Sequence, residues 1–178
     1  AHHIGPANLF YTQKTGYRAT MVGIPYDNHT RWASIYPSHI WSSQMAKSAV
    51  GFKKGITLLE QAYKVAKGGY KEKVAVALSR MKAVYIHLQA AAEQSKFFIA
   101  RDEYFEAKTD AERKEKLEIM RQACEVEREL IKQMLPVVSA DSEIAYESSN
   151  HYFYLPCDLG EAYLSVNYAL RKIERGEF

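Results

Sequence analysis

Two short segments of the chain combine aromatic rings with planar polar groups, a combination that suits sugar binding. The apolar face of a sugar ring can stack on an aromatic side chain, while its hydroxyls bond to acids, amides, guanidinium groups or imidazoles. The first segment is GIPYDNHTRWASIYP, residues 23–37, and the second is YESSNHYFY, residues 146–154. The candidate ligand-binding residues in these segments are Tyr26, Asp27, His29, Arg31, Trp32, Glu147, Asn150, His151 and Tyr152.

A second interpretation of the same residues is structural. The tyrosines of both segments would fill the end of a helical bundle, and Asp27 and Asn150 would bond to the backbone of turns. Asp27 and Glu147 both lie among aromatics in expected loops, so they are also the candidates for the two carboxyl groups that a glycosidase needs. The sequence does not place them face to face. The sequence therefore allows both interpretations of these segments, ligand binding and packing, and it assigns no catalytic residue.

Other reaction types find little support in the sequence. Di-iron bundles use Glu-x-x-His pairs, whereas the residues three and four positions from His87 are valine and alanine. Cys157 precedes Asp158, whose negative charge raises rather than lowers a thiol pKa. The sequence holds no Gly-x-Ser-x-Gly elbow and no Gly-rich phosphate loop. We therefore expect no metal site and no cofactor.

The composition is that of one soluble globular domain. The chain has 178 residues, of which 47% are hydrophobic and 25% charged, enough to bury a sizeable core. The net charge of +3 is small and the basic residues look spread out, so we expect no nucleic-acid partner. No apolar run is long enough to span a membrane, so we expect no membrane partner either. Two cysteines are too few for a disulfide framework, and Cys124 is predicted to be a free buried thiol.

Residues 41–178 carry the periodicity of four helices. The first follows Pro37, with Ser38 as its expected N-cap, and ends at Gly68 and Gly69. The second covers about 71–107, and the third begins at a capping box, Thr109 to Glu112, and stops between Pro136 and residue 140. The fourth begins near Asp158. Each helix shows one apolar stripe at spacings of three and four: Met45, Ala49, Phe52, Ile56, Leu59, Tyr63 and Ala66; Val74, Leu78, Met81, Tyr85, Leu88, Ala92, Ser95 and Ile99; Ile119, Met120, Ala123, Val126, Leu130 and Met134; Leu159, Tyr163, Val166, Leu170 and Ile173.

These patterns predict an all-α fold, an antiparallel up-down four-helix bundle with an irregular, extended N-terminal arm. Residues 1–40 form the arm, since proline and glycine interrupt every periodic run there, and residues 41–178 form the bundle. The stretch YRATMVGI, residues 17–24, is the one candidate for a short strand. Gly51 and Gly55 lie inside the first helix at a Gly-x-x-x-Gly spacing, which predicts the close approach of another backbone.

The end segments also resemble a known type of protein. GPANLFY, TMVGIPYDNHTRWASIYP and YESSNHYFYLPCDLGEAYLSVNYAL are similar to the C-terminal helical region of large bacterial proteins described as glycoside hydrolases. The family has a (β/α)₈-type catalytic domain before the helical part. The resemblance covers both ends of the chain, and the middle helices only by type. Asn28 replaces an Asp of the family pattern, and Phe153 stands where a tyrosine is common, so sugar specificity is expected to differ if these positions touch ligand.

The resemblance implies that the chain is a non-catalytic accessory region of a larger carbohydrate-active enzyme. Its partner would be the catalytic domain of the same polypeptide, with an oligosaccharide as a further contact, and the parent would be exported to the periplasm or the cell surface. A chain that does not begin with Met fits this expectation. The alternative is a self-standing helical module that binds carbohydrate or protein. An independent enzyme is the least supported hypothesis.

Overall fold

The structure, a computed structural model, describes residues 8–16, 25, 27–144 and 154–178. Five helices and no strand occur among these residues, so the predicted all-α class is confirmed. The candidate strand at 17–24 lies outside the described residues, as do Tyr26 and the part of the second candidate segment before Tyr154.

Four long helices lie close to the predicted ranges, and one short helix was not predicted. The helices are α1 His29–Ala33, α2 Ser38–Val65, α3 Gly69–Glu106, α4 Asp110–Ala140 and α5 Pro156–Glu174. The expectation that residues 1–40 are extended or irregular is therefore wrong at α1. Asn28 explains this helix locally, because its side chain accepts a hydrogen bond from the backbone N–H of Arg31 and so caps the first turn.

The helix starts confirm one predicted cap and correct another. Thr109 and Glu112 form the predicted capping box, each side chain accepting a hydrogen bond from the other's backbone N–H. Ser38 is not the N-cap of α2, since Pro37 holds that position and no side chain caps it. The last helix starts two residues before Asp158, whose carboxylate accepts a hydrogen bond from the Leu155 N–H at 3.2 Å.

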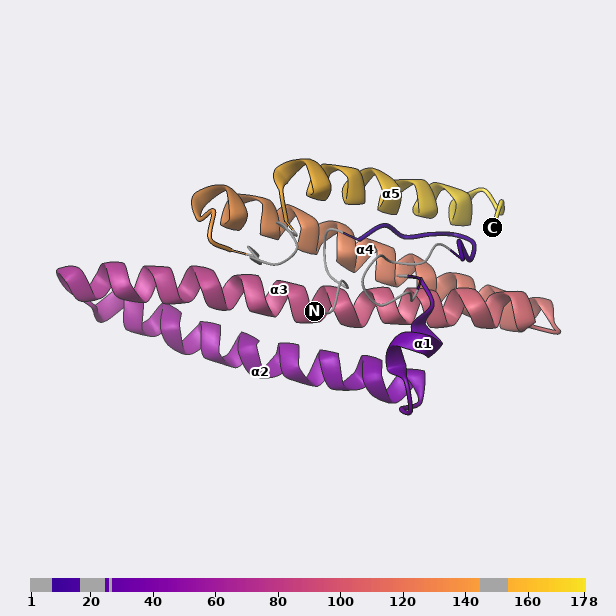
Figure 1. Ribbon diagram of the computed structural model, residues 1–178, viewed down its shortest axis with the longest axis horizontal. Coiled ribbons are helices and arrows are strands. Elements are labelled where there is room, and N and C mark those ends of the chain that lie inside the picture. The colour runs from indigo at the N-terminus through magenta and orange to yellow at the C-terminus, as the bar shows by residue number, and fades with distance from the viewer. Residues whose placement is uncertain (1–7, 17–24, 26, 145–153) are drawn as a thin grey trace.

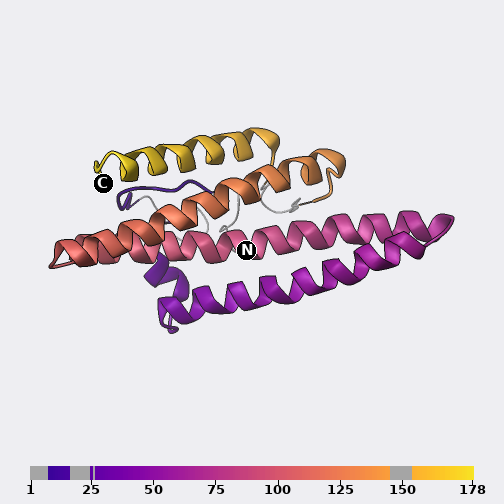
Figure 2. The same ribbon diagram turned by 180° about the vertical axis from the view of Figure 1, so that it is seen from behind.

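The long helices are arranged in a row. Figures 1 and 2 show α3 lying between α2 and α4, with α5 on the far side of α4. Among the five helices, all within the described part of the chain, α2 contacts α3, α3 contacts α4 and α4 contacts α5, while α1 touches α2 and α3. The helix α2 is therefore an edge helix.

The main core lies among α3, α4, α5 and the N-terminal arm. Phe10 of the arm is 2% exposed, and its ring centroid lies 4.7 Å from that of Phe97 and 6.2 Å from that of Phe98. The Phe10 backbone N–H donates to Ser165 Oγ on α5 at 3.0 Å. The arm runs between α5 and α3 in both ribbon views (Figures 1 and 2). The arm is thus part of the hydrophobic core, because Phe10 packs among residues of α3, α4 and α5.

Burial is concentrated in one half of α3. The buried residues of this helix begin at Ala83, and none lies in residues 69–82. On α2 only Ser42, Ala49 and Ile56 are buried. Figure 1 shows the turn between α2 and α3 projecting beyond the ends of α4 and α5. We call residues 38–82, which comprise α2 and the first part of α3, the hairpin.

One prediction about an individual position is wrong, and another is not met by contacts within the described chain. Val126 was expected in the stripe of α4, but it is 40% exposed and the neighbouring Glu127 is buried in its place. The two glycines of α2 were expected to admit another backbone. A Cβ at Gly51 would meet nothing within 4 Å, and one at Gly55 would meet the Met81 side chain, with Cε at 3.0 Å.

Among the residues that the structure describes, no helix combines the length and the apolar character needed to cross a membrane.

Candidate functional site

The first candidate segment is fastened to α3 by a buried ion pair. Asp27 is 2% exposed and Arg101 is 0% exposed at its side chain. Arg101 Nη1 donates to Asp27 Oδ2 at 3.0 Å, and Nη2 donates to the Asp27 backbone carbonyl at 2.8 Å. Thr15 donates to both oxygens of the same carboxylate, through its backbone N–H and its hydroxyl, each at 2.9 Å. Every oxygen of the Asp27 side chain is therefore engaged inside the protein.

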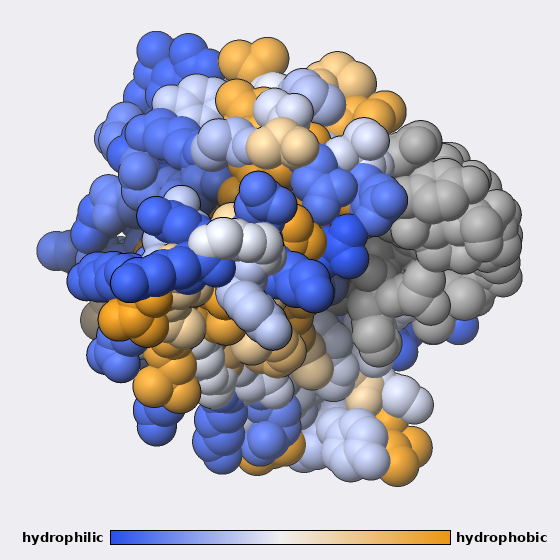
Figure 3. Space-filling model, turned by 90° about the vertical axis from the view of Figure 1, so that its left-hand side faces the viewer, coloured by the Kyte–Doolittle hydropathy of each residue, from blue (hydrophilic) through white to orange (hydrophobic). Residues whose placement is uncertain are grey.

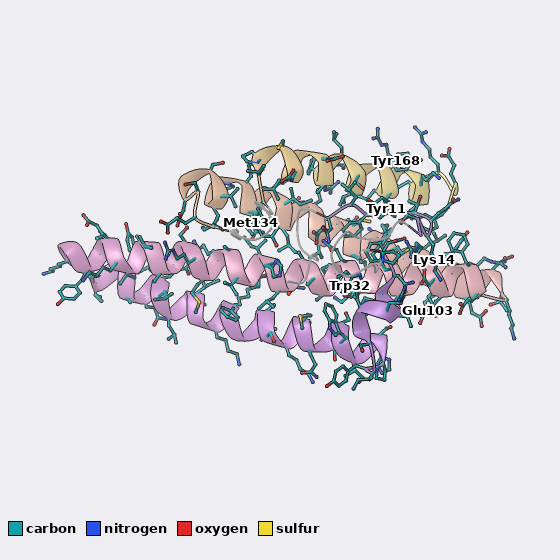
Figure 4. All side chains as sticks on the ribbon, viewed as in Figure 1. Tyr11, Lys14, Trp32, Glu103, Met134 and Tyr168 are labelled. Carbon is teal, nitrogen blue, oxygen red and sulfur yellow. The ribbon has the colours of Figure 1, made fainter. Side chains whose placement is uncertain are left out.

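Arg101 also holds the N-terminal arm. Its Nη1 donates to the backbone carbonyls of Tyr11 at 3.1 Å and Gln13 at 3.4 Å. Its Nε and Nη2 donate to Asp102 Oδ1, and Lys14 of the arm pairs with the other Asp102 oxygen at 3.1 Å. Figure 4 shows Lys14 and Trp32 at the end of the molecule where α1 meets α3. A guanidinium has five donors in a fixed plane, which explains why one arginine can join two chain segments to a helix. We call Arg101, Asp27, Thr15 and Asp102 the clasp.

His29, on α1 beside the clasp, is buried in an apolar setting. Its ring stands edge-on to Trp41, with centroids 5.4 Å apart, and neither ring nitrogen has a hydrogen-bond partner among the described residues. Burial lowers the pKa of His29 to about 4, with the charge of Asp102 opposing that effect. The imidazole is therefore neutral at neutral pH and serves as packing.

The remaining described candidates are more accessible. Arg31 is exposed, and Trp32 is half-buried with its indole N–H donating to the Pro25 carbonyl at 2.8 Å. The structure therefore brings Asp27 into the clasp, buries His29 beside it, and leaves Arg31 and part of Trp32 facing solvent. Five other candidates lie outside the described residues: Tyr26, Glu147, Asn150, His151 and Tyr152. A ligand-binding role for any of the nine stays a prediction.

A second group of buried polar residues lies between α3 and α4. Glu127 and Gln94 are both 0% exposed, and Gln94 Nε2 donates to Glu127 Oε1 at 3.3 Å. Glu93 is also buried, and its Oε1 accepts from Gln89 at 2.6 Å and from Lys96 at 2.7 Å. Burial raises the pKa of Glu127 to about 8, with Glu93 adding to the rise and Gln94 opposing it. The Glu127 carboxyl is therefore mostly protonated at neutral pH.

The neighbours of this carboxyl are also shifted toward their neutral forms. His87 Nδ1 and the Tyr154 hydroxyl form a hydrogen bond between α3 and the segment before α5. Burial raises the pKa of Tyr154, and the Glu127 charge adds to this. Burial likewise raises the pKa of Cys124, which is a free thiol as predicted, so it is a poor nucleophile. Cys157 is free and exposed, and the two thiols do not pair.

Sequence reasoning found part of this interior. The predicted burial of Cys124 as a free thiol is confirmed, whereas the burial of Glu127, with Gln94 as its hydrogen-bond partner among the described residues, was not predicted. Gln94 and Arg101 were missed, because they lie on a second stripe of α3, facing α4, which includes Ala83, Ile86, Ala90, Gln94, Phe97 and Arg101. The sequence does carry a signal for them, because Gln94 and Arg101 recur at helical spacing with apolar residues, and polar residues on such a stripe indicate buried hydrogen bonds.

The chemistry open to these two clusters is limited. In the part of the chain that the structure describes, no group of three or more His, Cys, Asp or Glu residues is placed to hold a metal ion. The clasp is fully bonded, and the Glu127 carboxyl is shielded from water and mostly protonated. The partly exposed carboxylate of the clasp, Asp102, is already paired with Arg101 and Lys14.

Comparison of the chain with models of protein families, with curated proteins and with solved structures finds no match.

Proposed function

We propose that the chain is a non-catalytic helical accessory region of a carbohydrate-active enzyme, a glycoside hydrolase, and that it supports the catalytic domain of that polypeptide. The observation that carries this proposal is the clasp. The segment with the most sugar-binding residue types uses its carboxylate, Asp27, to bind Arg101 and Thr15 inside the protein. A segment committed to internal bonds supports a scaffold role better than a reactive one.

The placement of the carboxyl groups supports the same proposal. Glycoside hydrolysis uses two carboxyl groups on either side of the scissile bond. Asp27, one of the two candidates, is 2% exposed and ion-paired. Glu127 has a raised pKa of the kind found in general acids, but it is fully buried. Neither carboxyl is accessible to a sugar.

Among the described candidates, those open to contact with glycan lie on the exposed side of the first segment. Arg31 is exposed and Trp32 is half-buried, so these two can meet a sugar at the edge of a cleft formed with the catalytic domain. The end motifs resemble the helical region of bacterial glycoside hydrolases. This resemblance implies a carbohydrate ligand but no particular sugar or linkage.

As the fold behind this function, we propose an antiparallel up-down bundle of α2 to α5 with residues 1–40 as its arm. The short turns between α2, α3 and α4 and the reversal of the colour gradient from each helix to the next in Figure 1 support it.

The experiment that tests this function is an activity assay on the isolated chain. Incubated with a panel of aryl glycosides, the chain is expected to release no aryl alcohol above the buffer rate. Release that Glu147→Gln abolishes would overturn the proposal and make the chain an enzyme. Immunoblotting of the source cells tests whether the chain belongs to a larger protein, because an accessory region predicts a band well above 20.4 kDa.

A self-standing binding module is the second candidate, and one observation favours it. Large apolar residues are exposed along α2, including Leu58 and Val65, which is typical of a surface that meets a partner. A cellular band near 20.4 kDa, together with a change in Trp32 fluorescence on adding an oligosaccharide, would favour this module. Trp41→Phe leaves Trp32 as the only reporter, and Trp32→Ala is its matched control.

A further inference from the structure

We propose that the outer face of α2 binds an acidic amphipathic helix of a partner protein. The helix α2 is at the edge of the row, where α3 packs on one side of it. Its buried residues, Ser42, Ala49 and Ile56, lie at intervals of seven and mark the side that faces α3. The opposite side of this 28-residue helix has no partner in the described chain.

That opposite side carries a regular stripe of exposed side chains. Lys47, Val50, Lys54, Leu58 and Val65 follow one another at spacings of three, four, four and seven, so they lie on one face of the helix. The exposed fractions of the three apolar members are 53% for Val50, 65% for Leu58 and 76% for Val65. This is the pattern by which one helix packs along another. We call these five residues the outer stripe.

Gly51 adds an independent reason to expect a helix there. An exposed glycine inside a helix costs about 1 kcal/mol relative to alanine, and a Cβ at Gly51 would meet nothing within 4 Å. Contacts inside the chain therefore do not explain the glycine. A glycine beside the stripe lets a second backbone approach closely, which a helical partner would use and a fluid lipid surface would not.

Charge identifies the chemistry of the partner. Nine Lys and Arg residues but only two Glu residues lie in the hairpin, so it carries a formal charge of +7, and the basic residues are not spread out as expected. The whole chain carries +3, which leaves −4 for everything else. Figure 3 looks at the end from which the hairpin projects and shows hydrophobic residues exposed among hydrophilic ones. Such a surface steers an acidic partner by long-range attraction and holds it by apolar contact.

This combination favours a protein helix over the other anionic partners. A nucleic-acid backbone would use the lysines but gain nothing from Val50, Leu58 and Val65. A membrane surface would take lysines at the border of an apolar band, whereas Lys47 and Lys54 alternate with the apolar residues along the outer stripe. The inference does not depend on the partner being a glycosidase domain, so it can hold or fail separately from the proposed function.

The test measures binding of two synthetic helical peptides to the whole 178-residue chain. Both peptides have about four heptads with Leu at two positions in each, and one has Glu on the flanks while the other has Lys. We expect the Glu peptide to bind and the Lys peptide not to bind. We also expect the Kd of the Glu peptide to rise by about tenfold or more between about 50 mM and about 500 mM salt.

Variants assign the binding to the outer stripe. Lys47→Glu with Lys54→Glu should raise the Kd of the Glu peptide by about tenfold or more. Gly51→Trp should do the same by blocking close approach, and the open space around Gly51 predicts that it folds. The matched control is Lys108→Glu with Lys114→Glu, two exposed lysines outside the hairpin, which should change the Kd by less than about twofold.

Several outcomes would overturn the inference. They are equal binding of both peptides, no binding of the Glu peptide, and unchanged binding by the Lys47→Glu, Lys54→Glu variant. A fourth is binding only to vesicles of phosphatidylcholine and phosphatidylglycerol, or only to duplex DNA, which would assign the face to lipid or nucleic acid. If circular dichroism shows Gly51→Trp to be unfolded, the charge-reversal variant decides alone.

Discussion

The two halves of α3 share one continuous helix and one apolar stripe, yet they have opposite surroundings. Residues 69–82 contain no buried side chain, whereas twelve are buried from Ala83 to Arg101. The stripe that faces α2 continues through both halves at spacings of three and four, so it does not distinguish them. The second stripe does, because it includes Ala83 and Ala90 of the core cluster and Arg101, which binds the arm. Among the described residues the first half packs on α2, and Arg80 adds only a surface pair with Asp141 and Glu143. Burial is decided by the number of packed neighbours.

The largest expected effect comes from breaking the clasp in the buried half. Arg101→Ala should lower the free energy of unfolding by about 3 to 5 kcal/mol, since it leaves the Asp27 carboxylate buried without its counter-charge. Urea unfolding followed by circular dichroism measures this. Arg80→Ala is the matched change, because Arg80 pairs with Glu143 and Asp141 at the surface and should cost less than about 1 kcal/mol. Equal losses of unfolding free energy in Arg101→Ala and Arg80→Ala would contradict the proposed difference between the two halves of α3.

A second comparison uses aromatic side chains. Phe10→Ala should destabilise by about 3 to 5 kcal/mol, because it leaves a cavity among Phe97, Phe98 and α5. Tyr70→Ala, in the hairpin, removes a ring that is 76% exposed and should change stability by less than about 0.5 kcal/mol. Thermal unfolding of both variants gives the contrast. A loss at Tyr70 as large as that at Phe10 would mean that the hairpin is covered in solution.

Two buried groups, Glu127 and His29, are expected to make stability depend on pH. The pKa of Glu127 is raised from 4.5 to about 8, so between these values the folded state holds a proton that the unfolded state has released, and the Glu127 contribution to stability falls as pH rises from about 4.5 to about 8. Above pH 6.5, where His29 no longer titrates, the expected fall is roughly 2 kcal/mol. The pKa of His29 is lowered from 6.5 to about 4, so in that range the unfolded state binds the extra proton, and the His29 contribution falls as the pH drops and opposes that of Glu127.

Variants separate the two sides of this profile. Glu127→Gln should remove the fall above pH 6.5 and steepen the fall below it, because the opposing contribution of Glu127 is lost. His29→Phe should keep the fall above pH 6.5, and its stability should continue to rise as the pH drops from 6.5 to about 4.5. Urea midpoints measured at intervals from pH 4 to pH 8 supply the profile. An unchanged alkaline side in Glu127→Gln would show that another group titrates there.

The smallest expected effect compares two glycines of the same helix. Gly51→Ala should raise stability by about 0.5 to 1 kcal/mol, because the helix gains a better former in open space. Gly55→Ala should gain less, since its Cβ would lie 3.0 Å from Met81 Cε and the methionine must shift. A larger gain at Gly55 would mean that Met81 moves freely.

The elements of the fold followed from the sequence more readily than their packing. Helical periodicity and the Thr109–Glu112 box located the long helices, because both signals depend on residues close in the chain. α1 was missed, since a one-turn helix has too few residues to show a period. Apart from the adjacent Asp102, the partners of Arg101 lie 74 and more residues away, and no local pattern encodes such a contact. For the same reason the sequence did not show that the Asp27 carboxylate is bonded inside the protein.

The hydrogen bond from Phe10 to Ser165 has a consequence for how the chain is made. The two residues are 155 positions apart, and the core that receives Phe10 includes residues of α5. At a synthesis rate of 5 to 20 residues per second, roughly 8 to 30 s pass between the emergence of the arm and that of its binding place. Throughout that time an aromatic side chain destined for the interior stays in water. Until the residues of α5 emerge, Phe10 lacks its native contacts and is open to non-native ones.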